Sequence, residues 1–461
     1  MQILHDRQPG PGGRRIAVLG DMLELGAASE PGHRQTGKWA ADAADLLVAY
    51  GPLSAAMAEA ARQKGLQTIH CQAAEEVVEY LRQNVRPGDV VLAKASHAMK
   101  LDDVLKQLYA ALPNAYLHIL GEYHRGMIVS WMLVAAAIGA FAVTALSGCF
   151  VIPALHKLHF GQTIRESGPT WHNKKQGTPT MGGLCFIFGI LVACGLVYAG
   201  FYRYAQDLLG IVQVRAALLA LFLAFGSGFI GFLDDYIKVV KHRNLGLLAW
   251  QKLIMQFIVT GGFLVGLHMQ GLLTTIIMLP FIGAVDLGWV YYPIAFFGII
   301  FLVNAVNLTD GLDGLCSCVT FVSMLGYLLA ASMLSFYHVA VLAAATAAAA
   351  AGFLVWNFYP AKVFMGDTGS MFLGGMVTAL AFIMGRPELV FFFGIVYIWD
   401  AMTVVIQRVY FKLTHGKRIF RMTPIHHAFE MRGWKEVKID FFFRLIAIIG
   451  VVLGLMYVYM A

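Results

Sequence analysis

Long apolar runs dominate the chain from Met127 to the C-terminus and constrain its fold more than any other feature. About ten of them approach the roughly 20 residues that a helix needs to cross a bilayer. With 59% hydrophobic and 13% charged residues, the sequence is too apolar for a soluble protein of 461 residues. We therefore expect a polytopic α-helical membrane protein with spans near residues 127–152, 181–201, 211–233, 253–272, 293–306, 315–335, 338–356, 370–385, 388–407 and 441–460.

Residues 1–122 differ from the rest in having mixed charge and ordinary apolar content. Short segments rich in Val, Ile, Leu and Ala predict strands: RRIAVLGDM, DLLVAYG, LQTIHC and GDVVLAKAS. Between them, PLSAAMAEAARQKG and AAEEVVEYLRQN predict helices. This alternation predicts a small parallel sheet with crossover helices. We expect two domains, a Rossmann-like α/β domain at 1–122 and a ten-helix membrane domain at 123–461.

The distribution of Lys and Arg among the loops predicts the orientation of the spans. Seventeen of these residues lie in the alternate loops 153–180, 234–252, 304–314, 357–369 and 408–440. The opposite loops contain two, Arg203 and Arg386. Loops rich in Lys and Arg stay on the cytoplasmic side, so the first set is predicted to be cytoplasmic. The same bias explains the net charge of +7, and we expect no nucleic-acid partner.

Unusual polar motifs gather in these basic loops: HNKKQGTPTMGG, DDYIK, NAVNLTDGLDG, NFYPAKVFMGDTGS and RMTPIHHAFE. They come from five loops that would meet at one membrane face, which favours a single site. The site would contain the carboxylates of Asp234, Asp235, Asp310, Asp313 and Asp367. Such a group repels itself unless a cation joins it, and oxygen-rich ligation with substrate phosphates suits Mg²⁺. The motifs therefore indicate phosphoryl transfer at a membrane surface.

Each motif taken alone has a plainer explanation. Asp-Asp at the end of a span is more often an interfacial anchor, and NLTDGLDG could be a turn with solvated acids. GTPTMGG could be a loop followed by a closely packed helix, and two histidines could form an interfacial patch. The occurrence of all five motifs on one side favours the single site.

At these motifs the sequence resembles the polyprenyl-phosphate N-acetylhexosamine-1-phosphate transferase superfamily, and within it the bacterial phospho-N-acetylmuramoyl-pentapeptide transferases. The resemblance covers about residues 127–461, and PIHH is typical of the branch that uses the muramoyl peptide. It implies transfer of phospho-MurNAc-pentapeptide from its UDP carrier to undecaprenyl phosphate, giving lipid I and UMP. It also implies a multi-pass protein of the bacterial inner membrane, surrounded by membrane lipids, with its active site on the cytoplasmic face. A homodimer is one of the oligomeric states that remain open.

The resemblance also implies roles for single residues. Asp367 would bind Mg²⁺, and Asp234 and Asp235 would engage the metal or the lipid phosphate. The catalytic group would be Asp234, Asp235, Asp367, His426, His427 and Lys175, with Lys175 on phosphate. Substrate would be bound by Asn307, Asp310, Asp313, Asn357, Phe364 and Thr178, with Phe364 near the uracil. One departure is Ala428, because the family usually has a third histidine at that position.

The first part resembles the C-terminal domain of Mur ligases, through AVLGDMLELG, His33 and VLAKASHAMKLDDVL. No G-x-x-x-x-G-K-[ST] phosphate loop occurs in the sequence, so we expect no ligation by this chain alone. The predicted topology puts residues 1–122 outside the cell, whereas Mur ligases act in the cytoplasm. The alternatives are a translocated domain, a first span that does not cross, or a fusion whose working form starts near Met127, which we favour.

Three other functions compete with this transferase. A sister transferase would use a UDP-N-acetylhexosamine, against which the PIHH loop argues. A transporter would place polar residues near the midplane within an internal repeat, and the sequence shows neither. An inactive membrane scaffold would use the Mur-like domain to recruit partners.

Overall fold

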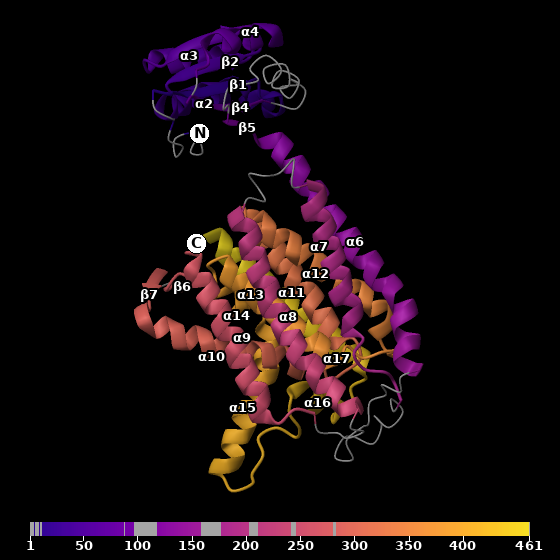
Figure 1. Cartoon of the computed structure of the whole chain (residues 1–461). Helices are drawn as coiled ribbons and strands as arrows, with labels where there is room; N and C mark the ends of the chain where they lie inside the picture. Colours follow the sequence, from indigo (N-terminus) through magenta and orange to yellow (C-terminus); the bar gives the residue numbers. More distant parts are fainter. Residues whose placement is uncertain are drawn as a thin grey trace. The chain divides into compact units, whose positions relative to one another are not determined.

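The computed structural model describes residues 4, 9, 12–86, 88–95, 118–157, 177–201, 211–240, 246–279 and 283–460 (Figure 1). The chain divides into two compact units, Met1–Ile128 and Val129–Ala461.

The first unit is built on a parallel sheet with strand order β3-β2-β1-β4-β5. The strands are β1 (Arg15–Gly20), β2 (Leu46–Tyr50), β3 (Gln67–Cys71), β4 (Val90–Lys94) and β5 (His118–Gly121). The helical elements are η1 (Leu23–Ala28), α2 (Ser29–Ala43), α3 (Ala55–Gln63) and α4 (Ala74–Asn84). The predicted parallel sheet and its crossover helices are confirmed. The sequence did not predict α2, in which Pro31, Gly32 and Gly37 lower helix propensity.

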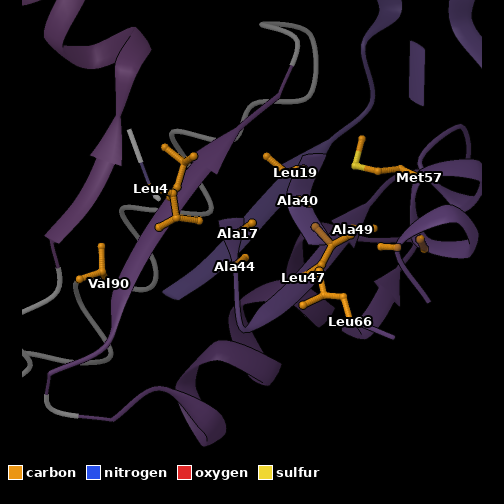
Figure 2. Packing of buried hydrophobic residues seen from close by; sticks show 13 residues of the cluster. Leu4, Ala17, Leu19, Ala40, Ala44, Leu47, Ala49, Met57, Leu66 and Val90 are labelled. Atoms are coloured by element: carbon orange, nitrogen blue, oxygen red, sulfur yellow. The ribbon is translucent and has the colours of Figure 1, made fainter. Parts of the chain in front are cut away.

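Both faces of this sheet are buried, which explains why its strands are apolar runs without alternation. In β1, Ala17 and Leu19 belong to one apolar cluster, and Ile16 and Val18 belong to another. The first cluster also contains residues of α2 and α3, among them Ala40 and Met57 in Figure 2. The second cluster contains Val77 and Leu81 of α4. Helices therefore cover the sheet on both faces.

The second unit is α-helical. Its long helices are α6 (Glu122–Lys157), α7 (Gly183–Phe201), α8 (Ile211–Val240), α9 (Ala249–Met269), α10 (Tyr291–Thr309), α11 (Leu315–Met333), α12 (Tyr337–Asn357), α13 (Gly366–Ile383), α15 (Ile395–Leu413) and α17 (Glu436–Met460). Shorter elements are β6 (Ile276–Leu279), β7 (Gly283–Asp286), η4 (Gly288–Val290), α14 (Leu389–Phe393) and α16 (Ile425–Glu430). α6 begins before Val129, and its apolar part belongs to this unit.

Within the described residues, nine helices are long and apolar enough to cross a membrane. They coincide with nine of the ten predicted spans, so the prediction of a polytopic membrane protein is confirmed. The remaining stretch, 388–407, folds differently from the expectation, because α14 and α15 meet at Gly394 instead of forming one helix. The sequence also did not predict the antiparallel pair β6 and β7 between α9 and α10.

α13 is the most deeply buried of the nine helices, because 89% of its apolar stretch lies inside the protein. It packs against α8 so closely that a Cβ atom at Gly231 would overlap the backbone carbonyl of Asp367. Small residues at such positions let the backbones of membrane helices come together. This contact brings the end of α8 beside the start of α13, which is where the acidic residues lie.

Candidate active site

An acidic cluster forms where α8 and α13 meet. Asp234 and Asp235 lie near the end of α8 and are buried, and Asp367 lies in the first turn of α13 and is partly buried. One carboxylate oxygen from each residue lies within 4.8 Å of the others. Asp234 and Asp367 are 133 positions apart in the sequence. The fold therefore brings distant acids together.

Two lysines neutralise this acidic cluster. The Nζ atom of Lys238 lies 2.6 Å from Oδ2 of Asp234, 3.2 Å from Oδ2 of Asp367 and 3.8 Å from Oδ1 of Asp235. The Nζ atom of Lys252, in the first turn of α9, lies 3.2 Å from the same Asp367 oxygen. Buried carboxylates need such partners, because removing their hydration is costly. Sequence reasoning placed Lys238 in the DDYIK motif and counted Lys252 among the basic loop residues, and it gave neither lysine an individual role.

Hydrogen bonds fix the orientation of the acids. Oδ2 of Asp235 accepts two bonds from Thr368, one from its N–H at 2.9 Å and one from its hydroxyl at 2.8 Å. Asn307 donates from Nδ2 to Oδ1 of Asp367 at 2.9 Å and to the Ser370 hydroxyl oxygen at 2.8 Å. Asn307, predicted to bind substrate, thus contacts the acidic cluster directly.

The loop containing Thr178 lies beside the loop that precedes α13. The N–H of Phe364 donates to the carbonyl of Pro179 at 2.9 Å, and the N–H of Gly182 donates to the carbonyl of Phe364 at 2.8 Å. These bonds bring the chain around Thr178 and Phe364 together, as expected for one site. Lys175 lies outside the described residues.

The turn between α10 and α11 contains Asp310 and Asp313. Oδ2 of Asp313 accepts a bond from the N–H of Ala361 at 2.9 Å, so this carboxylate joins the turn to the loop after α12. Burial raises the pKa of Asp310 well above its ordinary value, and the negative charges of Asp367, Asp235 and Asp313 raise it further. Asp310 is therefore electrostatically coupled to the acidic cluster.

Asn357, also predicted to bind substrate, is buried and bonded within the protein. Its Nδ2 donates to the carbonyl of Val363 at 2.9 Å, and its Oδ1 accepts from the Ser317 hydroxyl at 3.1 Å. These contacts connect α11, the end of α12 and the loop that leads to Asp367. Asn357 supports the loop, and the contacts that the structure gives it are not with the acidic cluster.

The two histidines differ in their surroundings. The ring of His426 is fully buried and its Nδ1 lies 2.7 Å from Oδ2 of Asp400 in α15. The His427 side chain is 18% exposed and its Nδ1 lies 2.6 Å from Oε2 of Glu430. Their ring centroids are 4.2 Å apart. Sequence reasoning missed Asp400, since a lone acid in an apolar stretch gave no indication of a histidine partner.

Comparison with known proteins identifies the family. The glycosyl transferase family 4 model matches residues 215–385, and signature 1 of the phospho-N-acetylmuramoyl-pentapeptide-transferases matches residues 175–187. A phospho-N-acetylmuramoyl-pentapeptide-transferase of Halalkalibacterium halodurans is 42% identical over 308 residues, which cover 67% of this chain and 92% of the relative. The chain belongs to the phospho-N-acetylmuramoyl-pentapeptide-transferase family.

Two further relatives are also phospho-N-acetylmuramoyl-pentapeptide-transferases. One from Clostridium perfringens is 42% identical over 323 residues, covering 69% of this chain and 94% of the relative. One from Acetivibrio thermocellus is 42% identical over 319 residues, covering 68% and 92%. A model of the Mur ligase glutamate ligase domain matches residues 2–97, which confirms the predicted resemblance of the first part.

Ala428 occupies the position at which the resemblance led us to expect a third histidine. It lies in α16 and is buried, with 6% of its surface exposed. This motif therefore contains two histidines, His426 and His427.

The acidic cluster fits a hard divalent cation. Its three donors are carboxylates, the ligand type that Mg²⁺ prefers, and they converge on a region where a lysine ammonium already lies. Asp235 and Asp367 each have one oxygen bonded to a neighbouring amide or hydroxyl, which would orient the carboxylate toward a metal.

Proposed function

We propose that this chain transfers phospho-MurNAc-pentapeptide from UDP-MurNAc-pentapeptide to undecaprenyl phosphate, forming lipid I and releasing UMP. The observation that carries the proposal is the acidic cluster of Asp234, Asp235 and Asp367 with its two lysines, in a member of this transferase family. Such a cluster can hold a metal and two anionic phosphate groups together.

The reaction joins two anions, so charge is the main obstacle. An oxygen of the lipid phosphate attacks the phosphorus that carries MurNAc, and the bond from this phosphorus to the oxygen bridging it to UMP breaks. The leaving UMP takes the bonding electron pair, and no redox partner is needed. Catalysis of this type depends on positioning and on neutralising charge more than on a strong base.

We assign the metal to the acidic cluster. Asp367, Asp234 and Asp235 would hold Mg²⁺, which when bound would neutralise phosphate charge. Lys238 and Lys252 lie at the same carboxylates, and their ammonium groups can turn to phosphate oxygens when a metal takes the acids. Lys175 would contact phosphate from the preceding loop, and His427, the partly exposed histidine, would meet the substrate.

We assign the sugar nucleotide to the side of the cluster formed by the turn at Asp310 and the loops of Thr178 and Phe364. The Asn307 side chain bonds to Asp367, and the Asn307 carbonyl accepts the N–H of Asp310 at 3.3 Å, so this turn begins close to the acidic cluster. Asn307 would hold Asp367 in place while facing the nucleotide. The loop asymmetry in Lys and Arg supports an active site on the cytoplasmic face of the inner membrane.

We treat residues 1–122 as a Mur-ligase-like α/β domain that does not take part in the transfer and 123–461 as the transferase domain. Two other functions compete with this proposal: the sister reaction with a UDP-N-acetylhexosamine, and an inactive scaffold. Family membership favours the muramoyl-peptide donor over the sister reaction, and the acidic cluster argues against an inactive scaffold.

The test is release of UMP by the purified chain in detergent, with undecaprenyl phosphate and either UDP-MurNAc-pentapeptide or UDP-N-acetylglucosamine. We expect release from the muramoyl donor only, dependent on Mg²⁺ and lost in Asp367→Asn. Asp286→Asn is the matched control, because Asp286 is an exposed acid at the end of β7 whose carboxylate accepts bonds from the Thr275 hydroxyl and the Gly288 N–H. Release that persists in Asp367→Asn, or that requires the other donor, would refute the proposal.

A further inference from the structure

The pair Asp400 and His426 is fully buried and lies beside the turn between α10 and α11. Both side chains are 0% exposed. One oxygen of Asp400 lies 2.7 Å from Nδ1 of His426, and the other accepts a longer bond of 3.4 Å from the His426 backbone N–H. The carboxylate thus contacts both the ring and the backbone of this histidine.

This contact fixes the ring in one orientation. A carboxylate can only accept, so Nδ1 must carry the hydrogen, and the other ring nitrogen, Nε2, points away from Asp400. No described residue hydrogen-bonds to Nε2, which is also buried. Without Asp400 the ring could rotate or take the other tautomer.

The far edge of the ring supports the turn between α10 and α11. A Cβ atom at Gly311 would overlap Nε2 of His426, so the imidazole lies directly against the backbone of this turn. The same turn is held at Asp313, whose N–H donates to Oε2 of Glu436 at 3.2 Å and whose carboxylate accepts from Ala361. Gly311 is therefore supported by packing on His426, whereas Asp313 is supported by hydrogen bonds.

Asp310 immediately precedes the glycine that rests on the imidazole. Among the described residues its carboxylate has no hydrogen-bond donor, in contrast to that of Asp313. A carboxylate without a donor among the described residues is suited to accept a bond from a ligand. The position of Asp310 depends on where the His426 ring holds the turn.

We propose that Asp400 is a positioning residue: it fixes the His426 ring, which sets the Gly311 turn so that Asp310 is presented to the sugar nucleotide. His426 then acts by support, and His427 is the histidine that meets substrate. This inference rests on the proposed function for the identity of the ligand. It assigns a role to Asp400, a residue outside the motifs that identified the site.

The experiment compares Asp400→Asn and Asp400→Glu with the wild-type chain, by equilibrium binding of UDP and by the kinetics of UMP release. For Asp400→Asn we expect KM for the sugar nucleotide and Kd for UDP to rise about tenfold, with kcat and KM for the lipid phosphate changed less than about threefold. Asp400→Glu keeps the carboxylate and should recover much of the affinity. General loss of structure would instead change both KM values together.

Asp440→Asn is the matched control. Asp440 is another buried acid of this unit, and it pairs with Arg444 instead of a histidine. We expect this variant to leave the ratio of the two KM values unchanged. If Asp440→Asn shifts that ratio as Asp400→Asn does, the effect is one of general packing and the proposal is overturned.

The outcomes separate the two proposals. UDP binding by the wild-type chain without UMP release would refute the transfer reaction, while the affinities of the variants would still test Asp400. Unchanged UDP affinity and KM in Asp400→Asn would overturn the positioning role alone. A wild-type chain that binds no UDP would overturn both.

Discussion

Buried carboxylates of the α/β unit and the acidic cluster of the membrane unit differ in how their charge is balanced. In the α/β unit, each buried acid is consumed by the fold: Asp21 accepts the backbone N–H groups of Leu53 and Ser54 at 3.1 and 2.6 Å. In the membrane unit, carboxylate oxygens of Asp234, Asp235 and Asp367 lie within 4.8 Å of one another, and the ammonium groups of Lys238 and Lys252 lie among them. Bringing like charges together costs free energy, so the folding of the chain alone does not explain why these three acids lie together.

Histidines show the same contrast. In the α/β unit, His33 uses both ring nitrogens internally, since Nε2 accepts from the N–H of Met22 at 3.0 Å and Nδ1 lies 2.7 Å from the carbonyl of Ser29. In the membrane unit, Nε2 of His426 has no partner among the described residues. Polar groups left incompletely satisfied indicate a ligand more reliably than polar groups alone.

The largest effect that follows from this comparison concerns Lys238. We expect Lys238→Met to lower the rate of UMP release by about 10²-fold or more, because its ammonium neutralises the acidic cluster and then the phosphates. Lys362→Met is the control, since Lys362 is an exposed lysine of a nearby loop that lies over the Trp356 ring. Equal rates in the two variants would mean that the acids do not need Lys238.

Gly366 tests whether the acids need a fixed backbone. Gly366 has φ +72°, and a Cβ atom there would lie 2.5 Å from Oδ2 of Asp235. We expect Gly366→Ala to lower the free energy of unfolding by about 3 kcal/mol and to abolish most UMP release, because strain and overlap add.

Gly385→Ala separates these two causes. Gly385 has φ +65°, but the nearest atom to a Cβ there is 3.7 Å away. It should show the strain alone, about 1 kcal/mol, with UMP release preserved. Thermal unfolding in detergent and the release assay together measure both variants, and similar losses in the two would exclude overlap at Asp235.

Asp21 tests the opposite behaviour in the α/β unit. Asp21→Ala leaves the N–H of buried Ser54 and the N–H of Leu53 without their carboxylate acceptor, and we expect it to destabilise this unit by about 2 kcal/mol. UMP release should stay at the wild-type rate. Hydrogen exchange of the β1 and β2 amides measures the first effect, and a parallel fall in UMP release would show that the two units are coupled.

The smallest expected effect concerns Asp89, whose contribution to the stability of the α/β unit depends on pH. Burial would raise the pKa of its carboxyl, but hydrogen bonds from Arg14 and the Arg86 N–H outweigh burial and hold the pKa below its ordinary value of 3.8. A lowered pKa stabilises the folded form above pH 3.8, and this stability is lost as the pH falls through the folded value.

We expect Asp89→Asn to cost about 1 kcal/mol at neutral pH and to remove that part of the acid dependence. Acid unfolding of the α/β unit, followed by hydrogen exchange, measures the change. An acid transition that is unchanged in Asp89→Asn would contradict the assignment to this carboxyl.

Much of the fold could be predicted from sequence, because apolar periodicity and span length are local properties. Nine spans and the strands β1 to β4 follow from such runs. The division of 388–407 at Gly394 could not be predicted, since a glycine within an apolar run is also tolerated in a continuous helix. β5 and the β6–β7 pair lacked a strong strand pattern and depend on their partners.

The candidate site was predictable only as far as its residues occur in dense motifs. Asp234, Asp235 and Asp367 meet in the structure, as expected from the prediction that their loops share one side of the membrane. Lys252 and Asp400 were missed, because each is a single polar residue whose partner lies far away in sequence. Predicting them requires knowing which helices pack together, and that information is tertiary.

The backbone contact between α8 and α13 limits how the site can move. Where Gly231 meets the carbonyl of Asp367, no side chain separates the two helices, so they have no soft layer on which to slide. A rise of about 1.5 Å per residue means that a slip by one position would change the separation of the acids by a large part of the 4.8 Å within which they meet. We therefore expect these two helices to keep the acids at a fixed spacing. Adjustment to substrate would then involve the lysine side chains and the loops around them.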